Sequence, residues 1–240
     1  IYTAHWDHLG IDPTLEGDQI YNGASDNATG TAGLLALAQL HAQAPAPERT
    51  VVFLAVTAEE SGLLGSQWYA EHPVYPIAST VANINMDNMN TVGRTHDVVV
   101  VGARGSELED YLADAAGRQG RYVQSEPNPE RGYYYRSDHF NFAKVGVPAL
   151  YAESGEDNIE FGRDYGAAQA EDYTENRYHQ PGDEYRASWD LSGAAEDLRL
   201  YFDIGQRLAN EQTFPEWYEG NEFKAIRDAS SARRLGSDPQ

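Results

Sequence analysis

The chain has 240 residues, of which 41% are hydrophobic and 23% charged, so it is long enough for one large unit with a buried core and shows no sign of disorder. Its formal net charge of −21 argues against nucleic-acid binding, because contacts to phosphates need clustered Lys and Arg. No apolar run approaches the roughly 20 residues of a membrane-spanning helix, so no membrane span is expected. The absence of Cys excludes disulfides and sulfur-ligated zinc, and any bound metal must therefore be held by His, Asp or Glu.

Short β-rich segments alternate with helical patterns, which is typical of parallel strands joined by crossover helices. The clearest predicted strand covers residues 50–57, TVVFLAVT, a continuous apolar run of the kind found where both faces of a sheet are covered. Further strands are predicted at 81–86, 97–101 and 147–152, and helices at 31–43, 62–72, 106–118 and 194–210. The predicted fold class is α/β, with a single doubly wound, mostly parallel mixed sheet flanked by helices.

Other segments do not follow this alternation. Residues 155–180 are polar, Tyr-rich and without periodicity, and we expect an ordered surface loop beside the functional site. Residues 212–240 are expected to form a peripheral C-terminal tail. The chain opens as if within a strand, with neither a start methionine nor a leader-type segment. We therefore expect residues 1–240 to be a single domain and a piece of a longer protein.

Side chains that suit metal ions follow several predicted strands. In open α/β sheets, ligands bind outside the carboxyl ends of the strands. The side chains at these positions are His5, Asp7 and His8 after the first strand, Asp26 before the helix that starts near residue 28, Glu59 and Glu60 after residue 57, and Asp87 after residue 86. Four separate strand or helix ends thus bring such side chains to one edge of the sheet.

Each of these segments also has a structural interpretation. A His at a strand end, such as His5, is often only hydrogen-bonded, although Asp7 is spaced to orient a ligating imidazole. An Asp before a helix, such as Asp26, is a common N-cap. Glu59 and Glu60 are more telling, because two adjacent carboxylates at the end of a buried strand repel each other unless a cation or a proton relieves them.

Six segments occur in order over nearly the whole chain: AHWDHLG, GASDNATGTA, TAEESGLLGS, NINMDNM, RSDHFNFAKVGVPAL and YHQPGDEY. In this order and spacing they resemble the zinc aminopeptidase and carboxypeptidase family known as peptidase family M28. The resemblance implies the zinc-dependent exopeptidase (phosphorylase/hydrolase-like) fold, peptide substrates and two zinc ions. It also implies strands before His5 that this chain would lack and, for a bacterial member, a secreted or periplasmic location.

The resemblance also implies a ligand set, carried over residue by residue. Asp26 would bridge the two zinc ions. One ion would be held in addition by His5 and Asp87, and the other by Glu60 and His179. These ligands contain no sulfur, and His with carboxylate is a donor set that suits zinc.

Four further residues have roles that the resemblance implies. Glu59 would act as general base on the bridging water and then protonate the leaving amine. Asp7 and Asp183 would orient His5 and His179. Tyr134, three residues before the SDH segment, would donate a hydrogen bond to the substrate carbonyl or its oxyanion. Some relatives have a disulfide beside this tyrosine, and here packing alone must hold that loop.

The expected activity is that of an aminopeptidase, which removes N-terminal residues from peptides, but other functions share the fold. Glutaminyl cyclases use one zinc, and the Glu59–Glu60 pair favours hydrolysis over that option. A carboxypeptidase would need a cation for the substrate carboxylate, for which Arg131, Arg136 and Arg163 are candidates. A non-catalytic, receptor-like binding domain would have no need of the complete ligand set.

Overall fold

A six-stranded sheet forms the centre of the computed structural model, which describes residues 1–236. The strand order is β4–β1–β5–β8–β6–β7. Neighbouring strands are parallel except β6 and β8, which are antiparallel. The strands are β1 (Tyr2–His5), β4 (Phe53–Val56), β5 (Asn83–Asn85), β6 (Asp97–Val100), β7 (Tyr122–Ser125) and β8 (Ala149–Ser154). The predicted mostly parallel mixed sheet is confirmed.

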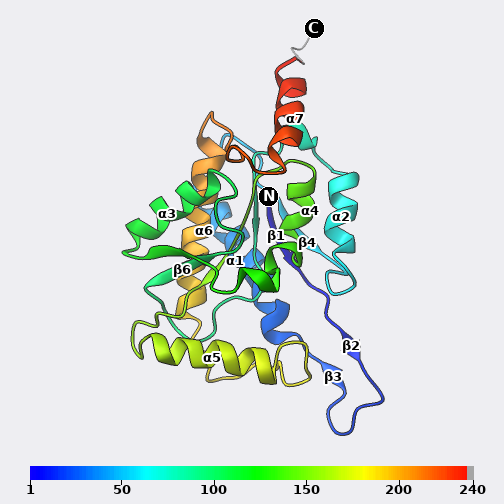
Figure 1. The fold of residues 1–240 in the computed structure, drawn as a ribbon, viewed down its shortest axis with the longest axis vertical. Helices are drawn as coiled ribbons and strands as arrows, with labels where there is room; N and C mark the ends of the chain where they lie inside the picture. The colour runs from blue at the N-terminus through cyan, green and yellow to red at the C-terminus, as the bar shows by residue number, and fades with distance from the viewer. Residues whose placement is uncertain (237–240) are drawn as a thin grey trace.

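Helices cover both faces of this sheet (Figure 1). One face carries α1 (Gly30–Gln43), α3 (Leu108–Arg118) and α6 (Ser192–Asn210), and the other carries α2 (Leu64–Glu71) and α4 (His139–Lys144). In α6, Leu200, Ile204 and Leu208 recur every four residues and are all buried, so they form the apolar stripe that holds the helix on the sheet. None of the helices described in residues 1–236 has the length and apolarity that a membrane crossing requires.

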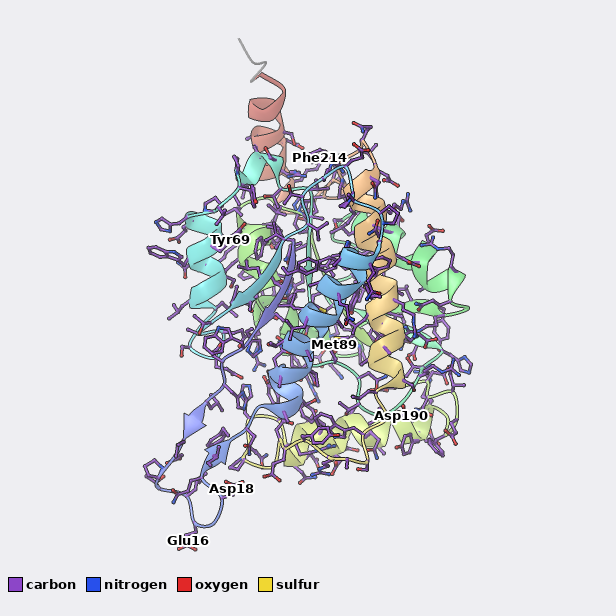
Figure 2. All side chains as sticks on the ribbon, turned by 180° about the vertical axis from the view of Figure 1, so that it is seen from behind. Glu16, Asp18, Tyr69, Met89, Asp190 and Phe214 are labelled. Atoms are coloured by element: carbon purple, nitrogen blue, oxygen red, sulfur yellow. The ribbon has the colours of Figure 1, made fainter. Side chains whose placement is uncertain are left out.

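The remaining elements lie around this centre. A hairpin of β2 (Gly10–Ile11) and β3 (Ile20–Tyr21) projects from the body, with Glu16 and Asp18 near its tip (Figures 1 and 2). Two further α-helices are α5 (Arg163–Asn176) and α7 (Lys224–Gly236). Short irregular helices are η1 (Ala24–Thr29), η2 (Ile77–Ser79), η3 (Pro129–Arg131) and η4 (Tyr133–Tyr135).

The strand predicted at residues 50–57 exists, but its position differs from the expectation. β4 pairs only with β1 and is the edge of the sheet within residues 1–236. Phe53 and Leu54 are half-buried and Ala55 is exposed, so the two faces of this strand are not fully covered. An apolar run indicates a strand with buried faces, whereas its place in the strand order depends on which other strands pair with it.

Two further expectations need correction. Residues 155–180 are not a loop throughout, because α5 occupies the middle of this segment; only Gly166 of this helix is buried, so it shows no apolar stripe in the sequence. The expected peripheral tail is packed in part, since Trp217 and Phe223 form a buried cluster with Ala143. The guanidinium of Arg227 donates to backbone carbonyls at residues 80 and 81. Residues 237–240 of that tail lie outside the described part of the chain.

Candidate functional site

Five of the residues predicted as ligands meet at the carboxyl edge of the sheet. His5 is the last residue of β1, Asp87 lies two residues beyond β5, and Asp26 lies in η1. The Nε2 atom of His5 is 3.1 Å from Oδ1 of Asp26 and 3.2 Å from Oδ1 of Asp87. The Nε2 atom of His179 is 3.3 Å from Oδ2 of Asp26 and 3.1 Å from Oε2 of Glu60. Asp26 therefore lies between the two histidines, with one oxygen facing each.

The electrostatics of this cluster are dominated by carboxylates. Burial lowers the pKa of His5, but hydrogen bonds to Asp26 and Asp87 outweigh it and raise that pKa to about 12. Hydrogen bonds to Asp26 and Glu60 raise the pKa of His179 to about 10. Burial opposes ionisation of Asp26, yet the two histidines hold its pKa well below the usual range. In the protein alone, the surrounding carboxylates thus favour the protonated form of both imidazoles.

Glu59 differs from its neighbour in its environment. Burial raises its pKa to about 9, and the nearby Asp87 carboxylate adds to the effect. With this set of negative neighbours Glu59 is a neutral acid at pH 7, and it becomes a base only when added positive charge offsets them. The turn that carries it is unusual, because Ala58 and Leu63 both have positive φ, 57° and 61°. Backbone strain of this kind is typical of functional sites.

The Asp7 carboxylate accepts hydrogen bonds from the backbone of the turn that carries Glu59. It accepts the backbone N–H of Glu59 at 3.1 Å and that of Glu60 at 3.4 Å. The Nδ1 atom of His5 is 3.2 Å from the carbonyl oxygen of Asp7 and 3.8 Å from its carboxylate. Asp7 therefore contacts His5, as expected, and also fixes the direction of the two glutamates.

Asp183 has a different partner from the one expected. Its carboxylate accepts the backbone N–H groups of Ser25, at 3.0 and 3.1 Å, and of Asp26, at 3.0 Å. Burial raises the pKa of Asp183, and these two N–H donors offset part of that effect. The residue whose position Asp183 fixes is thus Asp26 rather than His179.

A chain of buried hydrogen bonds holds Asp87 from the sheet side. The Thr3 hydroxyl donates to Oδ1 of Asn85 at 2.7 Å, and Nδ2 of Asn85 donates to the Ser137 hydroxyl at 2.8 Å. Ser137 in turn donates to Oδ2 of Asp87 at 2.6 Å. Since Oδ1 faces His5, both oxygens of Asp87 have fixed neighbours. Ser137 was not singled out from the sequence, although it lies in the SDH segment that carries the family resemblance.

Tyr134 is not brought into contact with this cluster. Its ring packs against His139 and Phe140, with ring centres 4.9 and 6.1 Å apart. Its hydroxyl is buried and has no hydrogen-bond partner within residues 1–236. Burial raises its pKa, and the carboxylate with the largest further effect is that of Glu222, which precedes α7. Tyr134 also packs against the buried cluster of Ala143, Trp217 and Phe223.

Tyr178, unlike Tyr134, contacts a residue of the cluster. Its ring stacks on His179, with centres 3.9 Å apart and planes 24° apart, and its hydroxyl accepts a hydrogen bond from Arg136 at 3.4 Å. Burial raises the pKa of this hydroxyl, and Asp26 and Asp87 are among the carboxylates that add to the effect. Its position directly before His179 was the signal available in the sequence.

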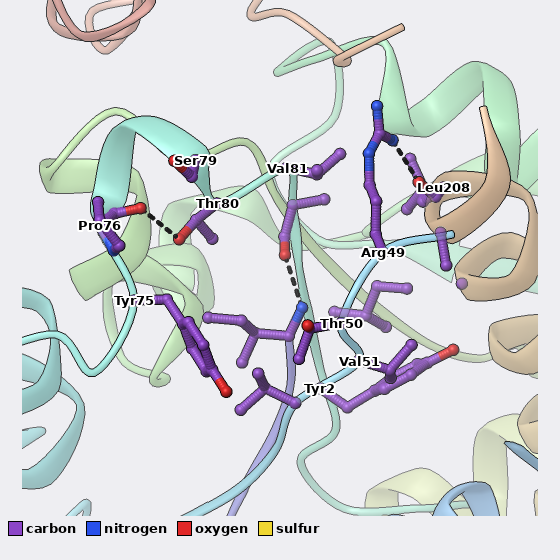
Figure 3. Close-up of a pocket in the computed structure, with 16 residues that line it drawn as sticks. Tyr2, Arg49, Thr50, Val51, Tyr75, Pro76, Ser79, Thr80, Val81 and Leu208 are labelled. Atoms are coloured by element: carbon purple, nitrogen blue, oxygen red, sulfur yellow. Dashed lines mark hydrogen bonds between the residues drawn. The ribbon is translucent and has the colours of Figure 1, made fainter. Parts of the chain in front are cut away.

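A cavity of about 440 Å³ lies elsewhere, at the amino ends of β1 and β4 (Figure 3). Tyr2, Arg49, Val51, Tyr75 and Leu208 are among the residues that line it. The predicted site residues do not line it, and it sits at the opposite end of the strands. The side chains able to bind a metal ion or transfer a proton therefore lie in the acidic cluster and not in this cavity.

The chain belongs to peptidase family M28, which matches residues 1–202. Over 90 residues it is 33% identical to aminopeptidase YwaD of Bacillus subtilis, a match that covers 37% of this chain and 18% of that protein. The fold is similar to that of LapA aminopeptidase of Legionella pneumophila, with TM-score 0.64 and 20% identity over 88% of this chain and 50% of that one.

Two further solved structures share the fold. A glutaminyl cyclase of Bacteroides thetaiotaomicron has TM-score 0.55 and 16% identity, and a Zn-dependent exopeptidase of Parabacteroides distasonis has TM-score 0.51 and 18% identity. Each match covers 88% of this chain and 72% of the other. Family membership indicates a peptidase, and the two solved structures show that the fold is shared. The chain spans about half the length of LapA.

Proposed function

We propose that this chain is the catalytic unit of a two-zinc aminopeptidase. His5 and Asp87 would hold one zinc ion, Glu60 and His179 would hold the other, and Asp26 would serve both. The observation that supports this most strongly is that the two carboxylate oxygens of Asp26 face different histidines, at 3.1 and 3.3 Å. A carboxylate in this position is able to contribute to two cation sites at once.

The side chains present fit zinc. All five offer an imidazole nitrogen or a carboxylate oxygen, the donors that zinc takes in sites without sulfur. The close approach of several carboxylates also requires positive charge, which the protons on His5 and His179 supply in the protein alone. Ligation needs both imidazoles in the neutral form, so binding of two dications would release these protons.

Glu59 would transfer the proton in the reaction. When bound, two zinc ions would supply the positive charge that lowers the pKa of a shared water and polarises the scissile carbonyl. A carboxylate oxygen of Glu59 would accept the proton of the attacking water and deliver it to the leaving amine nitrogen as the C–N bond breaks. Asp7 would keep Glu59 in place through its backbone N–H. The Tyr178 hydroxyl would donate a hydrogen bond to the substrate carbonyl oxygen.

A carboxypeptidase is the second candidate, because one of the three candidate arginines, Arg136, lies beside the proposed ligand His179. Arg163 is engaged by Tyr122 and Asp157, and Arg131 by the Tyr133 hydroxyl. Arg136 donates to the Tyr178 hydroxyl beside His179 and is therefore the arginine placed to meet a substrate carboxylate.

We place the aminopeptidase first because the chain is similar to aminopeptidases in both sequence and fold. Glu59 beside Glu60 supports hydrolysis rather than the cyclase reaction. The complete set of donors argues against a domain that only binds. Secretion or a periplasmic location is part of the proposal through family membership alone.

The experiment is a measurement of zinc per chain together with hydrolysis of aminoacyl chromogenic substrates, free and N-acetylated, on the same sample. We expect about two zinc ions per chain and turnover of the free-amine substrate alone. Glu59→Gln should keep the zinc and lose the turnover. Equal activity on the acetylated substrate would remove the aminopeptidase assignment, and a folded protein that takes up no zinc would remove the two-metal proposal.

A further inference from the structure

His8 is a buried histidine at the candidate site to which neither the family resemblance nor the proposed mechanism gives a role. Only 8% of its side chain is exposed, and its Nδ1 atom is 2.8 Å from Oε1 of Glu60. Its other nitrogen, Nε2, is buried and has no hydrogen-bond partner within residues 1–236. The ring lies edge-on to that of His179, with centres 6.0 Å apart. Glu60 is thus the hydrogen-bond partner of His8 in the structure.

The backbone around His8 leaves room for this ring. At Gly23, which has φ of +60°, an added Cβ would lie 2.6 Å from Cγ and 2.9 Å from Cβ of His8. A side chain at residue 23 would therefore collide with His8. Gly23 also opens the η1 segment that carries Asp26, so the ring and this segment pack against each other.

The two oxygens of Glu60 have separate partners. Oε1 faces His8 at 2.8 Å, while Oε2 faces His179 at 3.1 Å. With Glu60 ionised, Nδ1 of His8 must carry a proton to make this hydrogen bond, and a neutral ring then leaves Nε2 as the unprotonated nitrogen. A buried polar atom without a partner costs about 1–3 kcal/mol, so packing alone would be served better by an apolar side chain. The contact with Glu60 is what this position provides.

We propose that His8 is a positioning residue for the zinc site of Glu60 and His179, an inference that rests on the proposed function. By donating to Oε1 it fixes the rotation of the Glu60 carboxylate and leaves Oε2 toward His179 and Asp26. It acts through Glu60 rather than on the substrate. Partners of this kind typically change metal affinity by 10–100-fold when they are removed.

The geometry also brings His8, Asp26 and Glu60 within 4.8 Å of one another through potential ligand atoms, so the test must separate an orienting role from direct ligation. Two substitutions do this. Asn places an amide N–H close to where Nδ1 lies, and it is a poor zinc ligand, whereas Leu has a similar volume to His and no donor. His96→Ala, at an exposed histidine, is the matched control.

Zinc affinity is measured by competition with a chelator on metal-free protein, and urea unfolding of the same samples reports folding. We expect His8→Leu to weaken one of two zinc sites by about 10–100-fold and leave the other unchanged. His8→Asn should stay within about threefold of the wild type at both sites, as should His96→Ala. All variants should unfold cooperatively.

Two outcomes overturn the proposal. Unchanged affinity at both sites in His8→Leu means that His8 does not position Glu60, and equal losses in His8→Asn and His8→Leu mean that the ring itself is a ligand. If His8→Leu does not fold, the zinc affinity of His8→Asn is compared with that of the wild type instead. A tenfold loss of affinity in His8→Asn then overturns the proposal. Failure of the proposed function is distinguishable, because it shows in the wild type as absence of zinc and turnover.

Discussion

The substitution Tyr178→Phe separates the two tyrosines proposed for the substrate carbonyl. It removes a hydroxyl that accepts one long hydrogen bond from Arg136, at 3.4 Å, and keeps the ring that stacks on His179. The long bond contributes little to folding, so we expect a change of less than about 1 kcal/mol in the free energy of unfolding. Loss of a donor to the oxyanion should lower kcat about 100- to 1,000-fold, equivalent to about 2.7–4 kcal/mol.

Tyr134→Phe, by contrast, should leave activity nearly unchanged. Its hydroxyl is buried and has no hydrogen-bond partner in the described part of the chain, so its removal should leave the protein as stable as the wild type or more stable by up to about 1 kcal/mol. The ring contacts with His139 and Phe140 are kept in Phe. Activity should stay within about twofold, because Tyr134 packs on His139 and Phe140 and not on the candidate ligands.

The assay is kcat and KM for a free-amine aminoacyl substrate with zinc-loaded protein, with zinc content and urea unfolding as controls for each variant. Activity that survives Tyr178→Phe and falls 100-fold in Tyr134→Phe would refute the reasoning from the structure. It would mean that the tyrosine implied by the family resemblance does the work, and that the loop around η4 turns toward the carboxyl edge in the active protein.

Three further substitutions test how the fold and site are held. Asp183→Asn exchanges one carboxylate oxygen for an N–H donor that faces backbone N–H groups of η1. We expect the free energy of unfolding of the metal-free protein, measured in urea, to fall by about 2 kcal/mol, near the lower end of the range for charged hydrogen bonds because burial opposes the charge. The control Glu184→Gln, at an exposed residue, should have no effect. Leu37→Ala in the core of α1 should lose about 2–5 kcal/mol, and a loss as large for exposed Leu35→Ala on the same helix would contradict the assigned burial. Burial lowers the pKa of His139 to about 3, so between pH 6.5 and 3 the unfolded chain binds a proton that the folded chain does not, and stability falls with falling pH by up to about 1.4 kcal/mol per unit. His139→Leu should remove this part of the slope, and parallel stability curves for variant and wild type would show that it titrates normally.

The alternation of strands and helices could be predicted because each buried element shows its own pattern. The apolar runs ending near residues 57, 86 and 101 all contain strands, and the helix predicted at 194–210 is α6. α5 was missed for a physical reason, since a helix that buries only Gly166 needs no apolar stripe. The edge position of β4 was missed because local pattern reports burial and not pairing partners.

Strand ends that collect at one edge of a parallel sheet indicated His5, Glu59, Glu60 and Asp87, whereas His179 and the roles of the ligands came from the family resemblance. The same reasoning could not give side-chain directions. Tyr134 lies just before one family segment and Tyr178 opens another, and only the structure shows that one ring packs on His139 and the other stacks on His179. The partner of Asp183 was also beyond the sequence, because its two N–H donors lie more than 150 positions away.

The proposed ligands are held by contacts that do not depend on a cation, which bears on how the site forms. Asp26 is fixed through its backbone by Asp183, Asp87 by Ser137, and Glu60 by Asp7 through its N–H. The strained turn after β4 is tied down independently at Leu63, whose carbonyl accepts from the buried side chain of Asn141 at 2.9 Å.

Strain of about 1–3 kcal/mol per residue persists only where surrounding structure determines it. Folding therefore places most donors before metal arrives, and zinc must displace the protons that the carboxylates favour on His5 and His179. Zinc affinity should for this reason fall as pH drops, while the fold itself survives removal of zinc by chelation.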